Sequence, residues 1–132
     1  SFMLPFAKIG LIPDTACSWL VPQRLGQARA LGLAMTGNKL PAAKAAEWGL
    51  IWEAVAEEAF AESVQKLAEQ LATMPTKALV RTRQAMQAGR TNTLEQQLTL
   101  EGLYMRELGR SSDYVEGVSA FLEKRPPRFT GA

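Results

Sequence analysis

The sequence contains no histidine and only one cysteine, Cys17. Without histidine, this chain by itself forms neither a Ser-His-Asp triad nor a zinc site built from the usual His and Cys ligands. A single cysteine also excludes an internal disulfide. We therefore expect no metal site and no disulfide framework in this chain.

Long apolar runs and strong net charge are absent as well. No apolar run reaches the ~18 residues that a membrane-spanning helix needs, and no basic start leads into an apolar signal core. Lysine and arginine are scattered among the acids, and the formal net charge is only +2. This distribution provides no positive strip for a nucleic acid. We expect a cytoplasmic protein whose partners include neither a membrane nor a nucleic acid.

What the sequence does contain is typical of one ordinary globular domain. Its 132 residues are 47% hydrophobic and 21% charged, which is close to globular averages. The chain begins with Ser1 rather than Met, and residues 2–6 form a short apolar run for which no strand partner is visible downstream. We therefore expect the sequence to be a piece of a longer protein.

Helical patterns dominate the chain after Asp14. Apolar spacing, together with Pro, Gly and capping residues, predicts about seven helices and a mainly α fold class. Residues 6–12 are expected to be extended or turn-rich, and residues 50–55 to form an isolated edge strand or a connector. The expected helices cover residues 15–23, 26–35, 42–48, 57–73 and 76–88, a segment capped by Asn92 or Thr93, and a last one from Ser112 or Asp113 to Pro126.

Two stretches of consecutive apolar residues are too wide for one neighbouring helix to cover. They are Trp19–Val21 and Leu50–Trp52. Apolar surface of this extent is typical of an interface. We expect a partner that buries it, either another copy of the chain or a missing domain.

Asp14 is a carboxylate with two alternative roles. It follows Pro13 and precedes a helical segment, which suits an N-cap residue whose side chain accepts an orphan amide proton, worth ~0.5–2 kcal/mol relative to Ala. Alternatively, it lies at the edge of an apolar pocket, where desolvation would make it a usable acid or base near neutral pH. The residues alone leave both roles open.

Other conspicuous residues have plainer interpretations. Cys17 reads as a small helix residue, since no His or Lys lies close by in sequence to favour its thiolate. Trp48 and Trp52 are expected in the core. Lys124 and Arg125 are typical of a solvated tail, with phosphate binding as the alternative.

Several spaced motifs, taken together, resemble the second half of a crotonase, a member of the enoyl-CoA hydratase and isomerase superfamily. They run in order through the chain and cover residues 6–14 (FAKIGLIPD), 25–30, 36–38, 45–50 and 116–129 (EGVSAFLEKRPPRF). Within the superfamily, the Pro13-Asp14 pair and residues 47–52, 92–98 and 109–114 resemble isomerases of phenylacetate degradation.

The resemblance implies a ClpP/crotonase-like α/β spiral fold. This chain would be its C-terminal helical part, and the sheet-containing N-terminal half would be missing. Residues 1–56 would end the crotonase core and carry the catalytic Asp segment. Residues 57–132 would form the helical region for trimerisation and for covering the pocket. The implied assembly is a homotrimer or hexamer, with or without a hydratase partner.

The resemblance also assigns a role to Asp14. Hydratases of the superfamily have a Glu where this sequence has Phe6 and a small residue where it has Asp14, whereas isomerases that use an Asp have it at the position of Asp14. It therefore implies single-Asp proton transfer on an acyl-CoA thioester, with enolate stabilisation by backbone amides. The implied substrate contacts are Phe6, Ile12, Trp19 and Leu20, and Lys124 would contact CoA. Because CoA is part of the substrate, no separate cofactor is expected.

The implied reaction converts a ring-epoxidised phenylacetyl-CoA to an oxepin-CoA, and a double-bond shift in enoyl-CoA chains is a second expected reaction. The superfamily commonly has glycines after this Asp, where the chain has Ala16-Cys17. The oxyanion-hole amides would lie in the missing half, so the isolated chain is expected to be inactive. An enoyl-CoA hydratase and a helical oligomerisation fragment remain the alternatives.

Overall fold

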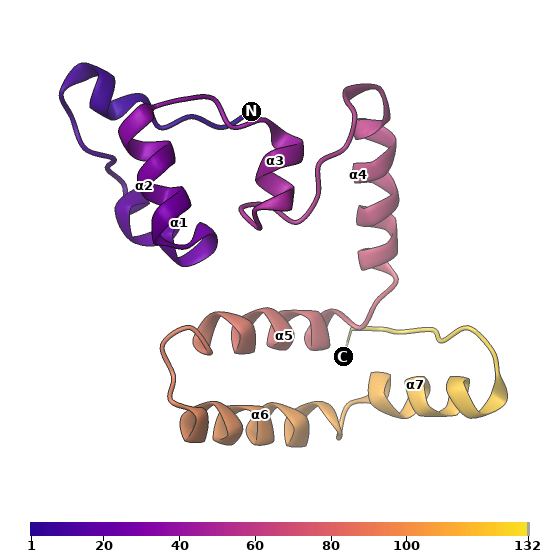
Figure 1. Ribbon diagram of the computed structural model, residues 1–132. Coiled ribbons are helices and arrows are strands. Elements are labelled where there is room, and N and C mark those ends of the chain that lie inside the picture. The colour runs from indigo at the N-terminus through magenta and orange to yellow at the C-terminus, as the bar shows by residue number, and fades with distance from the viewer. Residues whose placement is uncertain (132) are drawn as a thin grey trace. The chain divides into compact units, whose positions relative to one another are not determined.

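A computed structural model describes residues 1–131 and shows a chain built almost entirely from helices (Figure 1). The mainly α prediction is confirmed. The described residues form two compact units, Ser1–Ala61 and a second unit that begins at Glu62. The elements are η1 (Pro5–Ile9), α1 (Cys17–Leu25), α2 (Gln27–Thr36), α3 (Ala42–Glu47), α4 (Glu57–Ala72), α5 (Thr76–Ala88), α6 (Leu94–Leu108) and α7 (Ser112–Glu123).

Most helix boundaries follow the local signals in the sequence. Helix α5 has the predicted bounds, with Pro75 before it and Gly89 after it. Thr93 caps α6 in a reciprocal capping box, in which its side chain accepts from the Gln96 amide and the Gln96 side chain accepts from the Thr93 amide. Helix α7 starts at Ser112, as predicted, and the Ser111 side chain caps it by accepting from the Tyr114 amide. These ends lie within one or two residues of the predictions.

Two segments had alternative predictions, and the structure decides between the alternatives. Residues 5–9 form a short 3₁₀ helix, which is closer to the turn-rich alternative than to the extended one, because Pro5 presets the backbone and Gly10, at φ 76°, ends the turn. At residues 50–55 the connector alternative is confirmed and the edge strand is not, since these residues form bends and coil. The Leu50 amide instead donates to the Ala45 carbonyl at 2.9 Å, which closes the end of α3.

The start of the chain does find a partner, contrary to prediction. Phe2 and Leu40 form an isolated antiparallel bridge in which each amide donates to the other's carbonyl at 2.8 Å. This bridge ties the first residues to the segment before α3. Leu40 lies outside any apolar run, so no local pattern predicted this bridge.

The core of the first unit is small. It consists of the buried residues Leu25, Leu33, Leu40 and Ala45, with Trp48 among the partly buried side chains packed against them. Arg29 stacks its guanidinium 5.2 Å from the centre of the Trp48 ring. The core prediction is confirmed for Trp48. It is wrong for Trp52, which is 80% exposed.

In the second unit, α5 and α6 lie side by side and run antiparallel (Figure 1). Near one end, Gln97 Nε2 donates to the Ala85 carbonyl at 3.2 Å. Near the other, Arg81 Nη2 lies 2.8 Å from Glu107 Oε2 and its guanidinium stacks over Tyr104. The Arg81 hydrogen bond holds the pKa of Glu107 below its usual value.

Large apolar side chains remain exposed in both units. Ile12 and Phe121 are 80% and 82% exposed, and no large side chain among residues 1–131 is fully buried. The surplus apolar surface expected from the sequence is therefore present. Within the same residues, no helix has both the length and the apolar character needed to cross a membrane.

Candidate active site

Asp14 lies in the turn between η1 and α1. Its backbone carbonyl accepts a hydrogen bond from the Cys17 amide at 2.8 Å. The N-cap of α1 is Ala16, and no side chain caps this helix end. The N-cap role considered for Asp14 is therefore wrong, because two further residues separate it from the first helical turn.

Those two residues, Thr15 and Ala16, adopt left-handed backbone conformations, with φ of 49° and 61°. This conformation costs roughly 1–2 kcal/mol per residue for side chains with a Cβ atom. It also explains why α1 begins at Cys17 rather than at Thr15 as predicted. The helix cannot start until the backbone leaves the left-handed region.

The Asp14 side chain is exposed to solvent in this chain. Its Oδ1 accepts a long hydrogen bond from the Thr15 hydroxyl at 3.4 Å. The residues on either side of this turn, Pro13 and Cys17, both line an apolar pocket of about 400 Å³. Asp14 is thus placed beside the pocket without being buried by residues of this chain.

The pocket beside Asp14 is formed by the segment around η1 together with α1 and α2. Its wall is mainly aliphatic and includes Ile12, one of the predicted substrate contacts. The other three do not line it: Phe6 is half-buried, while Trp19 and Leu20 are 54% and 39% exposed. The structure therefore brings together Ile12 and the Asp14 turn and leaves Phe6, Trp19 and Leu20 outside this pocket.

Lys124, the predicted CoA contact, lies in the second unit. It ends α7 in a left-handed conformation with φ 54°, and its amide donates to the Ala120 and Phe121 carbonyls. Its side chain is exposed. Its role toward CoA stays a prediction.

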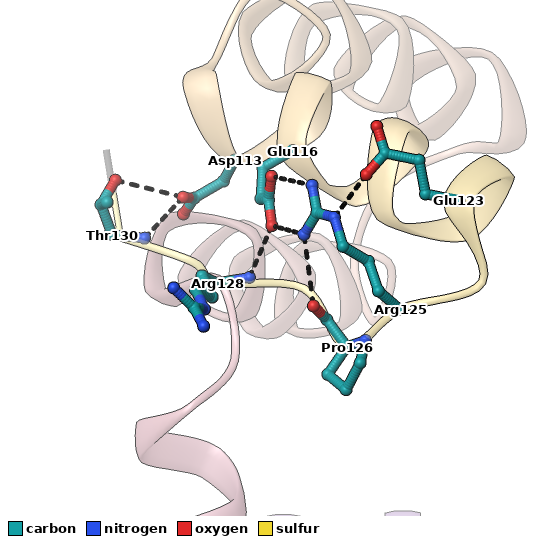
Figure 2. Close-up of polar contacts among 7 residues, drawn as sticks. All are labelled: Asp113, Glu116, Glu123, Arg125, Pro126, Arg128 and Thr130. Atoms are coloured by element: carbon teal, nitrogen blue, oxygen red, sulfur yellow. Dashed lines mark hydrogen bonds and ion pairs between the residues drawn. The ribbon is translucent and has the colours of Figure 1, made fainter.

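A cluster of polar contacts that sequence reasoning missed ties the C-terminal segment to α7; we call it the tail clamp (Figure 2). It consists of two carboxylates on α7, Asp113 and Glu116, and their partners after the helix, which are Arg125, Arg128, Thr130 and Gly131. The only sequence feature that could have suggested this contact is that Glu116 and Arg125 both lie within the 116–129 motif. Only the path of the chain after α7 reveals that these residues meet.

One half of the tail clamp is an ion pair. Arg125 donates from Nη1 to Glu116 Oε1 at 2.6 Å and from Nη2 to Oε2 at 2.9 Å. The Arg128 amide adds a hydrogen bond to Oε1 at 2.8 Å. Arg125, and then the Arg128 amide, lower the pKa of Glu116 to about 2. Arg125 is exposed, as the solvated-tail interpretation expects, and it is also paired with Glu116.

The other half of the tail clamp is buried. Asp113 is 5% exposed, and its Oδ1 and Oδ2 accept from the amides of Thr130 and Gly131 at 2.7 and 2.8 Å. The Thr130 hydroxyl also donates to Oδ1 at 3.2 Å. Through these contacts the tail returns to the start of α5 (Figure 1). A Cβ atom at Gly131 would lie 3.3 Å from the Thr76 hydroxyl.

A larger apolar pocket, of about 700 Å³, lies within the second unit. Residues from the start of α5, the end of α6 and α7 line it, and the tail contributes Phe129. The Phe129 ring packs close to Gly117, where a Cβ atom would lie 3.5 Å from the ring. The tail clamp therefore also positions one wall of this pocket.

Comparison with solved structures defines the class of protein to which this fold belongs. The chain superposes on the enoyl-CoA hydratase from Bacillus anthracis with a TM-score of 0.91 and 28% identity, covering 98% of this chain and 50% of that one. An enoyl-CoA hydratase from Polaromonas sp. JS666 gives a TM-score of 0.89 and 29% identity, with 97% and 50% covered. The fold is the C-terminal helical part of the crotonase fold.

Residues 1–132 match the family model described as enoyl-CoA hydratase/isomerase, and the chain belongs to this family. It is 54% identical over 130 residues to the 1,2-epoxyphenylacetyl-CoA isomerase of Escherichia coli K12, covering 98% of this chain and 50% of that protein. It is 47% identical over 131 residues to a Rhodobacter capsulatus protein named "Probable enoyl-CoA hydratase", with 99% and 51% covered. The chain spans about half the length of these relatives.

Proposed function

We propose that this chain is the Asp14-bearing half of an acyl-CoA isomerase of phenylacetate catabolism, which converts ring-1,2-epoxyphenylacetyl-CoA to oxepin-CoA. The observation that carries the proposal is the 54% identity to the Escherichia coli 1,2-epoxyphenylacetyl-CoA isomerase over nearly the whole chain. The aligned 130 residues cover 98% of this chain and therefore include the Asp14 turn and the pocket beside it.

In the proposed mechanism, Asp14 moves the proton. The thioester carbonyl acidifies the neighbouring C–H bond, Asp14 takes that proton, and the negative charge spreads onto the thioester oxygen, where backbone amides outside this chain stabilise it. The epoxide then opens, the ring rearranges to the seven-membered oxepin, and Asp14 returns the proton. Substrate and product contain the same atoms, so one acid-base group suffices. The same site would shift double bonds in enoyl-CoA chains.

The exposure of Asp14 in this chain sets a requirement for the proposal. A carboxylate in water is a poor base for a carbon-bound proton, and removal of water would strengthen it. The apolar pocket between Pro13 and Cys17 supplies one dry wall beside it. We propose that the remainder of the full-length protein supplies the other walls and the oxyanion-hole amides.

Assembly and location complete the proposal. We propose a cytoplasmic homotrimer or hexamer, with or without a hydratase partner, in which residues 57–132 carry the subunit contacts and residues 1–56 the Asp14 segment. The exposed apolar side chains of α6 and α7, such as Phe121, support a role in subunit contact. No cofactor besides the CoA of the substrate enters the mechanism, and Lys124 remains the candidate CoA contact.

The experiment that tests the role of Asp14 is Asp14→Asn in the full-length protein. Asn keeps the size of the side chain but cannot take up a proton at neutral pH, so turnover of the epoxide should fall by ~10²-fold or more with KM little changed. Glu53→Gln, which neutralises an exposed carboxylate of the same unit, is the control and should keep wild-type turnover. Wild-type turnover in Asp14→Asn would exclude this role.

A second candidate function, water addition to enoyl-CoA, is supported by the 47% identity to the Rhodobacter capsulatus protein. A hydratase that activates and protonates around water needs two carboxylates, and the Phe6 ring cannot serve as one. An assay with crotonyl-CoA separates the two candidates. Hydration at a rate equal to or above isomerisation would favour the hydratase.

A third candidate is that the chain, by itself, acts only as a helical assembly module. The small core and the exposed apolar faces support it. Light scattering on the 132-residue chain tests it directly. A folded monomer at micromolar concentration would argue against obligate assembly.

A further inference from the structure

Residues 125–131, which we call the tail strap, run back along the helix that precedes them. At the start of the strap, Arg125 pairs with Glu116 of α7 (Figure 2). At its end, the Gly131 amide donates to Asp113, which lies about one turn earlier on the same helix. The strap and α7 are therefore antiparallel, and the strap contacts the helix at two successive turns.

Two carboxylates hold the backbone of the tail strap. The Arg128 amide donates to Glu116 Oε1 at 2.8 Å. The Thr130 and Gly131 amides donate to the two oxygens of Asp113 at 2.7 and 2.8 Å, and Asp113 is only 5% exposed. Because three backbone amides donate to two side chains, loss of either carboxylate frees more than one contact.

Phe129 lies between these two anchors. Its ring lines the 700 Å³ apolar pocket and packs against α7 at Gly117, where a Cβ atom would lie 3.5 Å from the ring. The amides on either side of it, those of Arg128 and Thr130, are both held by α7. The backbone of Phe129 therefore stays in place while both anchors hold, and a strap that leaves α7 takes the ring out of the pocket wall.

The rest of the tail strap is suited to detachment. Residues 125–128 are exposed, and Phe129 is the only large apolar side chain of the strap. Segments with few buried apolar contacts open locally at a lower free energy than the core. The chain reverses at Lys124, at φ 54°, and the prolines at 126 and 127 restrict the backbone after it. A stiff segment that follows a turn should move as one piece while α7 stays folded.

We infer that the tail strap is a detachable lid on the apolar pocket of the second unit, held closed by Asp113 and Glu116 and carrying Phe129 into the pocket wall. When the strap detaches, the pocket loses its Phe129 wall and opens at Gly117. An apolar molecule then gains access from this side. The inference concerns the second unit and does not depend on the role proposed for Asp14.

Hydrogen exchange of the full-length wild-type protein, followed by mass spectrometry at single-residue resolution, provides the first test. Relative to their intrinsic rates, the Arg128, Thr130 and Gly131 amides should exchange at least ~10-fold faster than amides in the middle of α7, because the strap opens without the helix. Equal protection of the strap and the helix would mean that both open together, and would overturn the inference.

Glu116→Gln tests whether the strap detaches as one piece. The variant removes the charged acceptor of Arg125 and of the Arg128 amide and leaves Asp113 in place. Exchange of the Gly131 amide, whose acceptor is Asp113, should still accelerate at least ~10-fold. Faster exchange confined to the Arg128 amide would show that the two anchors are independent, and the inference would fail.

Phe129→Ala removes the ring from the pocket wall. Its matched control is Phe60→Ala, which removes a 58% exposed ring from the first unit. Only Phe129→Ala should accelerate exchange of the Gly131 amide. Equal Gly131 exchange in Phe129→Ala, Phe60→Ala and wild type would show that the ring does not help to close the strap, and would overturn its place in the lid.

Opening of the pocket is measured with anilinonaphthalene sulfonate, a dye that fluoresces on exposed apolar surface. Glu116→Gln should raise the dye fluorescence of the full-length protein above that of wild type, and Phe60→Ala should not. Unchanged fluorescence in a Glu116→Gln protein whose strap exchanges faster would show that detachment leaves the pocket closed. The strap would then not be a lid.

Discussion

Arg125 binds both carboxylate oxygens of Glu116, with Nη1–Oε1 and Nη2–Oε2 distances of 2.6 and 2.9 Å (Figure 2). A bidentate pair of this kind fixes geometry as well as charge, since the two planar groups can meet in few orientations. Here it holds the segment after α7 against the helix it has just left. The tail clamp therefore holds the segment after α7 in place. Because this attachment depends on the ionised Glu116 carboxylate, it is sensitive to acid.

Acidification should release the tail clamp. The pKa of Glu116 is about 2 in the folded chain, against an ordinary value of 4.5. Because the folded value is depressed, the stabilisation is complete above pH about 4.5 and is lost as pH falls toward 2. The thermal midpoint of the second unit should fall across this window. Circular dichroism melts at a series of pH values would measure it.

Glu116→Gln provides the comparison for this prediction. The amide cannot ionise, so the variant should melt at a lower temperature at neutral pH and show a shallower loss on acidification. Glu62→Gln, which removes one member of an exposed pair with Lys66, should keep the wild-type pH dependence. If Glu116→Gln and wild type lose stability in parallel, the pair does not control the acid response.

Removal of the buried carboxylate should free the last residues of the tail. Asp113→Ala deprives the Thr130 and Gly131 amides of their acceptors. A buried amide left without a partner costs ~1–3 kcal/mol, and the tail can avoid part of this cost by moving into water. Faster hydrogen exchange at both amides, with a loss of about 1–3 kcal/mol in unfolding free energy, is the expected result.

Asp113→Asn is the matched control, because it keeps one acceptor oxygen. It should protect one of the two amides better than the alanine variant does. Equal protection in wild type, Asp113→Asn and Asp113→Ala would show that the carboxylate does not anchor the tail.

The first unit should depend on very few core side chains. Leu33 is 7% exposed in α2, whereas Leu31, two residues earlier on the same helix, is 47% exposed. Leu33→Ala should cost ~2–5 kcal/mol and Leu31→Ala clearly less, since only the first leaves a cavity. Urea titrations of both variants measure the difference. Similar losses would mean that α2 does not bury its Leu33 face in solution.

The contribution of the reciprocal cap at the start of α6 to the unfolding free energy should be measurable by itself. Thr93→Ala removes the acceptor for the Gln96 amide, bonded at 3.2 Å, and should cost ~1 kcal/mol. Thr99→Ala, inside the same helix, is the control and should change the unfolding free energy by less than ~0.5 kcal/mol. A Thr93→Ala variant as stable as Thr99→Ala would refute the contribution of the cap.

The ends of the helices were predicted well because local signals set them. The burial of individual side chains was predicted poorly because it depends on distant segments. Helix α5 has the expected bounds because a proline and a glycine bracket it, and both act through their own backbone torsions. The spacing of Trp52 among apolar residues predicts a core position, yet Trp52 is 80% exposed, because burial depends on which surface another segment covers. The candidate site likewise combines a feature that local sequence predicts with features that it does not. Its sequence position was predicted, but the exposure of Asp14 and the left-handed residues after it were not.

The amino-acid sequence by itself determined the mainly helical character of this protein, the order of its helices and its membership of a family, since periodicity, breakers and motifs act over a few residues. Tertiary structure alone decided that Phe2 pairs with Leu40, that Asp113 is buried by the tail, and that Ile12 lines the pocket beside Asp14. The physical reason is that hydrogen bonding and burial between distant residues depend on the path of the whole chain. No local pattern encodes that path.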